Sequence, residues 1–334
     1  MTAKTAPKVT LWEFFQQLGK TFMLPVALLS FCGIMLGIGS SLSSHDVITL
    51  IPVLGNPLLQ AIFTWMSKIG SFAFSFLPVM FCIAIPLGLA RENKGVAAFA
   101  GFVGYAVMNL AVNFWLTNKG ILPTTDAAVL KANNIQSILG IQSIDTGILG
   151  AVIAGIIVWM LHERFHNIRL PDALAFFSGK RAVAIFTALY SIVAALVLFF
   201  VWPLVYGALV TLGETFIGMG ALGAGIYAFF NRLLIPFGLH HALNNVFWFD
   251  TIGLGDLSHF WAGETSADVS WSLGMYMSGF FPCMMFGIPG AALAMVHTAK
   301  SNKKKVAIGL LSSAAIAAFV CGVTEPFEFG FMFL

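Results

Sequence analysis

Charged side chains are scarce in this sequence: of 334 residues, only 9% are Asp, Glu, Lys or Arg. A soluble domain carries about 25% charged residues, so this chain has too few to cover a globular surface with polar groups. Because 59% of the residues are apolar, lipid must be the solvent for much of the surface. The formal net charge of +3 is too small to indicate a nucleic-acid partner.

Cysteine is rare as well, and its placement excludes two common kinds of site. All four cysteines lie in apolar runs: Cys32, Cys82, Cys283 and Cys321. The sequence has no CxxC motif and no Cys/His spacing typical of a metal centre. It therefore indicates neither a metal site nor a disulfide framework, and we expect no cofactor.

The first 20 residues lack the features of a cleavable signal peptide. Aromatic and apolar side chains, among them Trp12 and Phe14, stand near Lys4, Lys8 and Lys20. This mixture predicts an interfacial amphipathic helix before the first membrane span.

Long apolar segments recur along the chain, and a membrane span needs roughly 20 apolar residues. The candidates are residues 22–42, 57–89, 96–116, 147–161, 182–210, 215–235, 236–249, 271–296 and 306–320. Segment 236–249 contains Pro, Gly, His and Asn, and segment 306–320 would be about 22 Å long as a helix, too short to cross. The predicted fold class is an all-α, polytopic transmembrane helical bundle with broken or re-entrant segments.

Charges in the loops predict an orientation. Lys and Arg gather in three loops, near residues 91–94, 164–181 and 300–305. The loops 43–56 and 250–270 contain neither. By the positive-inside rule, the basic loops and the N-terminus are cytoplasmic. With this orientation, the loop 250–270 lies outside only if segment 236–249 crosses the membrane or forms part of a hairpin. Broken segments of this kind bind the substrate in transporters.

Ionisable residues within apolar sequence cost about 2.5–3.5 kcal/mol each on insertion and are candidates for function. Arg232 is either a snorkelling or loop arginine at a helix end, or a fixed cation that orients a sugar hydroxyl, a carboxylate or a phosphate. His240 and His241 follow a Pro/Gly break, with Asn244 one turn further on. This grouping favours a polar site over satisfied core histidines.

A second polar motif is Thr324-Glu325-Pro326. Pro326 has no amide hydrogen and restricts the residue before it, so we expect the backbone to turn here. Glu325 would then lie at the tip of a short segment, where a desolvated carboxylate suits a proton acceptor. The alternative is an ordinary loop glutamate outside the membrane. Glu328, one turn further on, is expected to cap a helix or to pair.

Three weaker signals complete the pattern. Asp145 is expected to cap a helix that begins near Gly147. The Gly-Ile-Pro-Gly stretch at residues 287–290 predicts a kink. The lysine run 303–305 is an orientation signal, and contact with anionic lipid is a further hypothesis.

Four motifs occur in order along the chain: FFSGKR at 176–181, NRLLIPFGLHH at 231–241, GIPGAALAM at 287–295 and GVTEPFEF at 322–329. Together they resemble the membrane (IIC) component of sugar phosphotransferase systems, in the glucose superfamily. The resemblance extends from near Lys8 to the last residue. It implies a homodimeric, multi-pass permease of the bacterial inner membrane that takes up and phosphorylates a glucose-type sugar, maltose or glucose.

The resemblance also implies an organisation and partners. Residues 1–20 would be the amphipathic segment, 21–211 a scaffold with the dimer interface, and 212–334 part of the sugar-binding transport domain. The phosphate donor would be a phosphocysteine of a IIB domain, which a IIA protein supplies. No cysteine here has the cationic neighbours of a reactive thiolate, so the donor would belong to another chain.

Residue roles follow from matching the motifs. Glu325 falls on the suspected catalytic base of the family, and Arg232 and His240 fall on residues that contact the sugar. We add His241, Asn244 and Thr324 to the predicted substrate-binding set.

The chain stops within apolar sequence just after the Glu325 motif, which predicts a truncated form without the rest of the transport domain or a IIB domain. Two alternatives stay open. One is an ion-coupled sugar transporter with Glu325 and His240 as a proton relay. The other is a truncated scaffold that dimerises without transporting. The sequence does not identify the sugar, because pocket size is a tertiary property.

Overall fold

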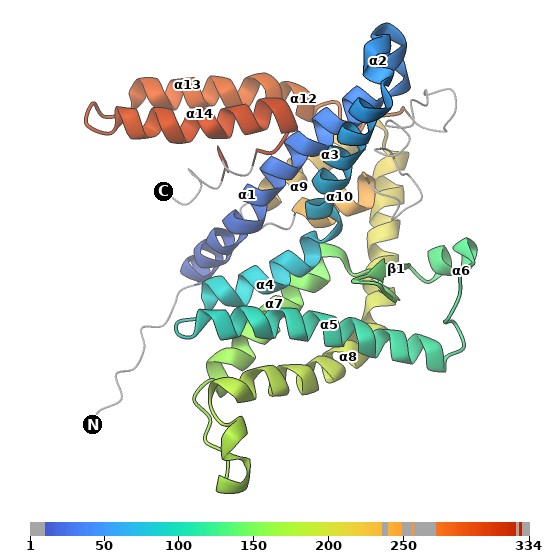
Figure 1. The fold of residues 1–334 in the computed structure, drawn as a ribbon, viewed down its shortest axis with the longest axis vertical. Coiled ribbons are helices and arrows are strands. Elements are labelled where there is room, and N and C mark those ends of the chain that lie inside the picture. The colour runs from blue at the N-terminus through green and yellow to red at the C-terminus, as the bar shows by residue number, and fades with distance from the viewer. Residues whose placement is uncertain (1–10, 236–239, 249–255, 257–271, 325–326, 329–334) are drawn as a thin grey trace.

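The computed structural model describes residues 11–235, 240–248, 256, 272–324 and 327–328 (Figure 1). Among these residues, helices make up nearly all of the regular structure. Five described helices are long and apolar enough to cross a membrane, or up to six if a bent pair counts as one span. The expected all-α, polytopic fold is therefore confirmed.

Helices α1 (Leu11–Ser43) and α3 (Pro57–Ser75) pack closely because small residues face each other. A Cβ atom at Gly70 of α3 would clash with the backbone of α1. The Oγ atoms of Ser40 and Ser67 lie 3.0 Å apart between the two helices. Small residues let helix backbones approach, so that van der Waals contacts and hydrogen bonds hold helices together in lipid. The connection consists of α2 (His45–Leu50) and the 3-10 turn η1 (Pro52–Gly55).

The chain bends by 47° between α3 and α4 (Leu77–Leu89). Pro78 lies in the first turn of α4, and its missing amide hydrogen cannot continue the hydrogen-bond ladder of α3. The sequence predicted one apolar segment over residues 57–89. The structure corrects this to two helices that meet at Phe76.

Helices α4, α5 (Lys94–Asn118) and α7 (Gly147–Phe165) form a layer with the first half of α8 (Figure 1). The start of α7 is capped as expected: the amide of Gly147 donates to Oδ1 of Asp145 at 2.8 Å. This bond satisfies one of the amides that a helix start leaves without a partner.

A small β-hairpin lies between α5 and α7, after the short helix α6 (Ala127–Ala132). Strands β1 (Ile135–Ile138) and β2 (Ile141–Ile144) pair antiparallel, with Ile135 opposite Ile144. The turn places Leu139 and Gly140 at φ 53° and 80°, the positive values of a two-residue hairpin turn. Both strands read Ile-Gln-Ser-Ile, a repeat that the apolar pattern of the chain did not reveal.

Helix α8 (Lys180–Gly218) follows the 3-10 turn η2 (Asp172–Phe177), contains Pro203 and changes direction along its length (Figure 1). Met219 and Gly220 separate its end from α9 (Ala221–Leu234). The predicted segment 215–235 is therefore wrong as one unit, because it begins inside α8 and breaks at Gly220, whose φ is 57°. The predicted domain boundary at 211/212 also falls inside α8, and the division into domains stays a prediction.

The remaining elements surround the polar motifs. They are α10 (His240–Phe247), α12 (Phe280–Pro282), the π-helical turn η5 (Cys283–Gly287), α13 (Ile288–Thr298) and α14 (Lys304–Cys321). The π-helical turn ends at Gly287, two residues before Pro289, and overlaps the predicted kink at 287–290 in this one residue, so the kink itself stays a prediction. A proline removes a backbone hydrogen bond to the preceding turn, and a wider turn accommodates its ring. Helices α13 and α14 lie side by side as a hairpin (Figure 1).

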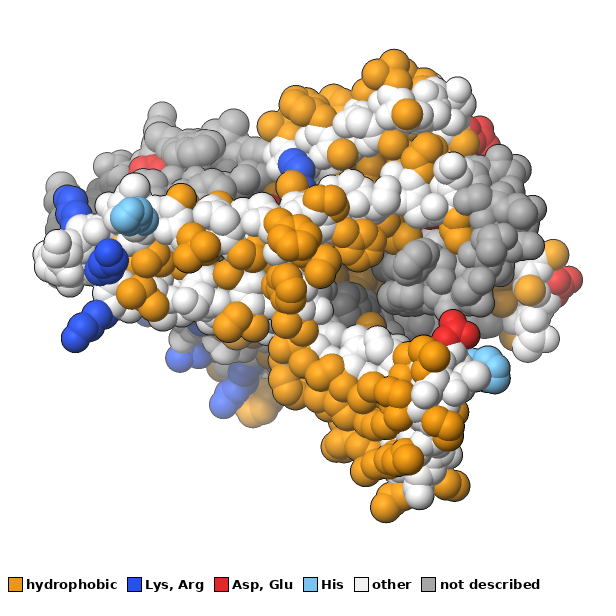
Figure 2. All heavy atoms as spheres, turned by 90° about the horizontal axis from the view of Figure 1, so that it is seen from above, with side chains coloured by type: hydrophobic (Ala, Val, Ile, Leu, Met, Phe, Trp, Pro, Cys, Tyr) orange, Lys and Arg blue, Asp and Glu red, His pale blue; other side chains and the backbone are white. Residues whose placement is uncertain are grey.

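Two of the three basic loops lie on the same side of the molecule. In Figure 1 the α4–α5 turn, the α13–α14 turn and the start of α1 lie toward the left, whereas α2 and α6 lie toward the right. Figure 2 shows most Lys and Arg side chains of the visible face toward the left and most Asp and Glu toward the right. This arrangement is what the charge pattern of the loops requires; which side is cytoplasmic stays a prediction.

Candidate functional site

The centre of the candidate site is Arg232, in the last turn of α9. Its Nη1 donates to Oε1 of Glu328 at 2.8 Å and to Oγ1 of Thr324 at 3.3 Å. Glu328 is buried, whereas 31% of the Arg232 side chain is exposed. Arg232 is thus a paired cation within the protein, and the expected pairing of Glu328 is confirmed.

Arg232 also has hydrogen-bonding capacity to spare. Its Cζ lies 4.7 Å from the ring centre of Phe280, which adds a cation–π contact. Within the described part of the chain, both hydrogen bonds of the guanidinium use Nη1. Since the group carries five N–H donors, those on Nε and Nη2 can bind a ligand from the exposed side.

A second buried network joins α9 to α10. Oδ1 of Asn244 accepts hydrogen bonds from the Tyr227 hydroxyl, at 2.8 Å, and from Nδ2 of Asn231. All three side chains are buried. The carbonyl oxygen of Asn244 is thus occupied by α9, and only its NH₂ group is available for the predicted contact with substrate.

His240 is the first residue of α10 and is buried. It precedes Asn244 by four residues, so both lie on the same face of the helix. The backbone of His241 belongs to α10, but its side chain lies outside the described residues. Glu325 also lies outside them, and its predicted role is not tested.

Thr324 connects the second polar motif to this site. Besides accepting from Arg232, it accepts the amides of Phe327 and Glu328 at its carbonyl oxygen, both at 3.0 Å. These bonds are the backbone turn expected around this motif. The structure therefore brings Thr324 and Arg232 into direct contact, and it links Asn244 to Asn231, the neighbour of Arg232.

Residues that the sequence analysis did not single out complete the site. Tyr227 and Asn231 are four residues apart and so share one face of α9. The sequence shows this spacing, but only the structure shows that the two side chains belong to one hydrogen-bond network. Asp256 is buried, and its Oδ1 accepts a hydrogen bond from the amide of Gly274 at 2.8 Å.

Aromatic rings pack around these polar groups. The ring of Tyr227 lies 4.5 Å from Phe247, 5.7 Å from Tyr276 and 5.9 Å from Phe280, centre to centre. They belong to one buried cluster with Phe216, Leu243 and Val246. Such packing fixes the positions of α9 and α10 and keeps water from their network. The Tyr276 hydroxyl is buried and has no hydrogen-bond partner in the part of the chain that is described.

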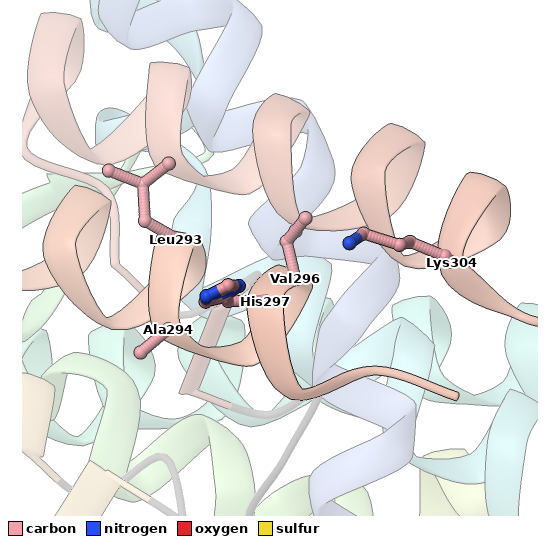
Figure 3. Close-up of a pocket in the computed structure, with 5 residues that line it drawn as sticks. All are labelled: Leu293, Ala294, Val296, His297 and Lys304. Atoms are coloured by element: carbon pink, nitrogen blue, oxygen red, sulfur yellow. The ribbon is translucent and has the colours of Figure 1, made fainter. Parts of the chain in front are cut away.

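A hollow lies away from these polar groups. It has a volume of about 450 Å³ and opens between α13 and α14, near the lysine-rich turn (Figure 3). Its lining residues are Leu293, Ala294, Val296, His297 and Lys304. None of these is a predicted site residue. The evidence for the candidate site is therefore its polar contacts and not the volume of a cavity. No group of three His, Cys, Asp or Glu that could hold a metal occurs among the described residues.

Comparisons with known proteins agree with the motifs. The family model for "Phosphotransferase system, EIIC" matches residues 19–334. The chain is 68% identical to the PTS system maltose-specific EIICB component of Escherichia coli K12, over 100% of this chain and 66% of that protein. It is 39% identical to the N-acetylglucosamine-specific EIICB component of Bacillus subtilis, over 96% of this chain and 62% of the relative.

A third relative is the glucose-specific EIICBA component of Staphylococcus saprophyticus, 37% identical over 96% of this chain and 48% of the relative. The chain thus spans about two thirds or less of the length of the relatives it matches.

Proposed function

Because this chain belongs to the phosphotransferase system EIIC family, we propose that it is the membrane permease part of a sugar phosphotransferase system. It takes up and phosphorylates a glucose-type sugar, and the 68% identity to a maltose-specific relative favours maltose. The observation that carries the proposal is the contact between Arg232 and Thr324. It joins two of the family's motifs across 92 residues of sequence, next to a partly exposed guanidinium whose hydrogen bonds within the described part of the chain both use Nη1.

The reaction needs few groups from this chain. A sugar hydroxyl attacks the phosphorus held on a IIB phosphocysteine, the P–O bond forms, the P–S bond breaks and the thiolate leaves. Glu325 accepts the hydroxyl proton, and His240 holds a sugar hydroxyl. The N–H groups on Nε and Nη2 of Arg232 stabilise negative charge, since positioning and electrostatics provide most of the catalysis in phosphoryl transfer.

The ion pair with Glu328 gives Arg232 a defined position. A guanidinium held at Nη1 presents its other donors in a fixed plane, which suits recognition of planar or anionic groups. The Tyr227–Asn231–Asn244 network fixes α10, and with it His240, relative to α9. The substrate contacts proposed for His241, Asn244 and Thr324 belong to the same site.

The remaining parts of the proposal concern assembly. We place the dimer contact in residues 21–211 and the sugar-binding half in residues 212–334, with IIB and IIA as partners. The N-terminus and the basic turns face the cytoplasm of the bacterium, across its inner membrane. Lys304 and neighbouring lysines lie where anionic lipid headgroups would contact them.

The proposal is tested by phosphoenolpyruvate-dependent phosphorylation of maltose and of glucose in vesicles that contain the permease with its IIA and IIB partners. Glu325→Gln is expected to abolish phosphorylation while sugar binding persists, and Arg232→Lys to reduce it because lysine lacks the planar donors. Full activity of Glu325→Gln contradicts the role of this residue. Accumulation of unmodified sugar that a protonophore abolishes would instead support ion-coupled transport.

A further inference from the structure

A small cavity lies where the β-hairpin, the start of α7 and α8 meet α10. Its volume is about 20 Å³. One water molecule requires about 10–15 Å³ on this measure, so the cavity has room for one water and for no sugar or lipid group. Among its lining residues are Asp145, Thr146, Trp202 and Val246.

Two of these residues carry polar atoms that lack a partner. Nε1 of Trp202 and Oγ1 of Thr146 are buried without a hydrogen bond among the described residues. The two residues are 8% and 3% exposed, respectively. Buried polar atoms in native proteins are nearly always satisfied by protein or by ordered water. Two residues that carry unsatisfied polar atoms line the same cavity, which indicates a ligand there.

The chemistry of the lining selects the ligand. The Trp202 indole can only donate a hydrogen bond, whereas the Asp145 carboxylate accepts and the Thr146 hydroxyl does either. Oδ1 of Asp145 accepts from the Gly147 amide, and the carboxylate has a second oxygen, Oδ2, that can accept as well. The positive end of the indole N–H dipole would repel a cation, and the carboxylate would repel an anion. A molecule that both accepts and donates fits all three groups.

We propose that one resident water molecule occupies this cavity, accepts from Trp202 Nε1 and donates to the Asp145–Thr146 edge. The water then bridges α8 to the start of α7 at the point where Val246 of α10 packs against them. Helix α10 also carries His240 and Asn244. The water therefore helps to hold α10 in its position against α7 and α8. This inference does not depend on the proposed transport activity.

The first test is Thr146→Val in the full chain, which removes the hydroxyl and keeps the shape. If water bridges Thr146, the variant loses a satisfied bond, and its thermal unfolding midpoint falls by about 2–4 °C. The matched control is Thr187→Val in α8, because Thr187 is also buried and its hydroxyl has no partner among the described residues, but it lines neither of the two cavities described above. Removing an unsatisfied hydroxyl is neutral or stabilising, so the control keeps or raises the midpoint.

The second test is Trp202→Phe, with Trp159→Phe as control, since the Trp159 indole nitrogen is likewise buried without a partner and lines neither cavity. A shared water makes Trp202→Phe and Thr146→Val non-additive: the double variant loses less than the sum of the two shifts. The proposal is overturned if Thr146→Val is no less stable than Thr187→Val, or if the two cavity variants add independently. An empty cavity in a high-resolution density map also overturns it.

Discussion

Residues 11–218, from α1 to the end of α8, and residues 221–328, from α9 onward, are held together by different interactions. In the first region, buried apolar clusters and close helix packing dominate. Two buried polar side chains in its spans, Thr21 and Asn109, bond to carbonyl groups of their own helices. In the second region, buried side chains bond to one another between elements, as the Tyr227 hydroxyl of α9 does to Asn244 of α10.

This difference predicts what disturbs each region. A region held by shape is sensitive to added volume and tolerant of a lost polar atom. A region held by directed hydrogen bonds between distant segments is sensitive to the loss of one atom, because the group that remains is buried without a partner. The following variants test this contrast, from the largest expected effect to the smallest.

Gly70→Ala tests the region held by shape. The added methyl group clashes with the backbone of α1, which cannot move aside as a flexible side chain would. We expect a loss of about 3 kcal/mol in unfolding free energy, seen as a lower midpoint of thermal unfolding. Gly37→Ala is the control, because its Cβ has open space; it is expected to be neutral or to stabilise by about 0.5–1 kcal/mol. Equal stability of the two variants would contradict close α1–α3 packing.

Glu328→Leu tests the directed contacts. It leaves the Arg232 guanidinium without its carboxylate, and we expect a loss of about 2 kcal/mol, less than for a fully buried pair because Arg232 is partly exposed. The double variant Arg232→Leu/Glu328→Leu removes both charges and should regain much of this loss. Unfolding midpoints measure both effects. If the loss of unfolding free energy in the double variant equals the sum of the losses in Arg232→Leu and Glu328→Leu, the two residues are not coupled.

Tyr227→Phe removes one oxygen atom and keeps the ring. Because this hydroxyl donates to Asn244, we expect a loss of about 1 kcal/mol and weaker sugar binding, as α10 is held less firmly. Tyr276→Phe is the control, since this neighbouring hydroxyl lacks a partner among the described residues, and its removal should be neutral or stabilising. Calorimetric titration with sugar measures the first effect; identical behaviour of both variants refutes a positioning role for Tyr227.

Asp145→Asn gives the smallest effect, and its sign depends on pH. Burial raises the pKa of the Asp145 carboxyl, although the Gly147 amide opposes the shift. The folded state therefore binds the proton more tightly than the unfolded state, so stability falls as pH rises from about 4 through the raised pKa.

The asparagine variant keeps the oxygen that accepts from Gly147 and loses this pH dependence. The exposed Asp126, substituted in the same way, serves as control. Unfolding midpoints from pH 4 to pH 8 measure the slope. A slope that is the same in wild type and Asp145→Asn would rule out Asp145 as its source.

The sequence predicts the two regions unequally well, for physical reasons. Apolar runs are a local property, so they locate most spans, and the cap at Asp145 is visible in three consecutive residues. The bend before Pro78 and the end of α8 at Gly218 lie inside continuous apolar sequence, which conceals them. The β-hairpin is too short for its alternation to stand out.

The candidate site shows the same limit. Arg232 and Thr324 stand out because each is a polar residue in apolar surroundings. The role of Tyr227 cannot be seen from sequence, because a tyrosine in an apolar helix gives no sign of which partner its hydroxyl finds. That partner, Asn244, comes from another helix, and only the tertiary structure brings them together.

The ion pair of Arg232 has a consequence for how the protein is made. Glu328 follows Arg232 by 96 residues. At a synthesis rate of about 5–20 residues per second, the arginine leaves the ribosome roughly 5–20 seconds before its partner. During that interval α9 carries an uncompensated cation, whose insertion into lipid is costly. Helix α9 is therefore expected to wait at the membrane surface and to enter the bundle late, together with the segment that neutralises it.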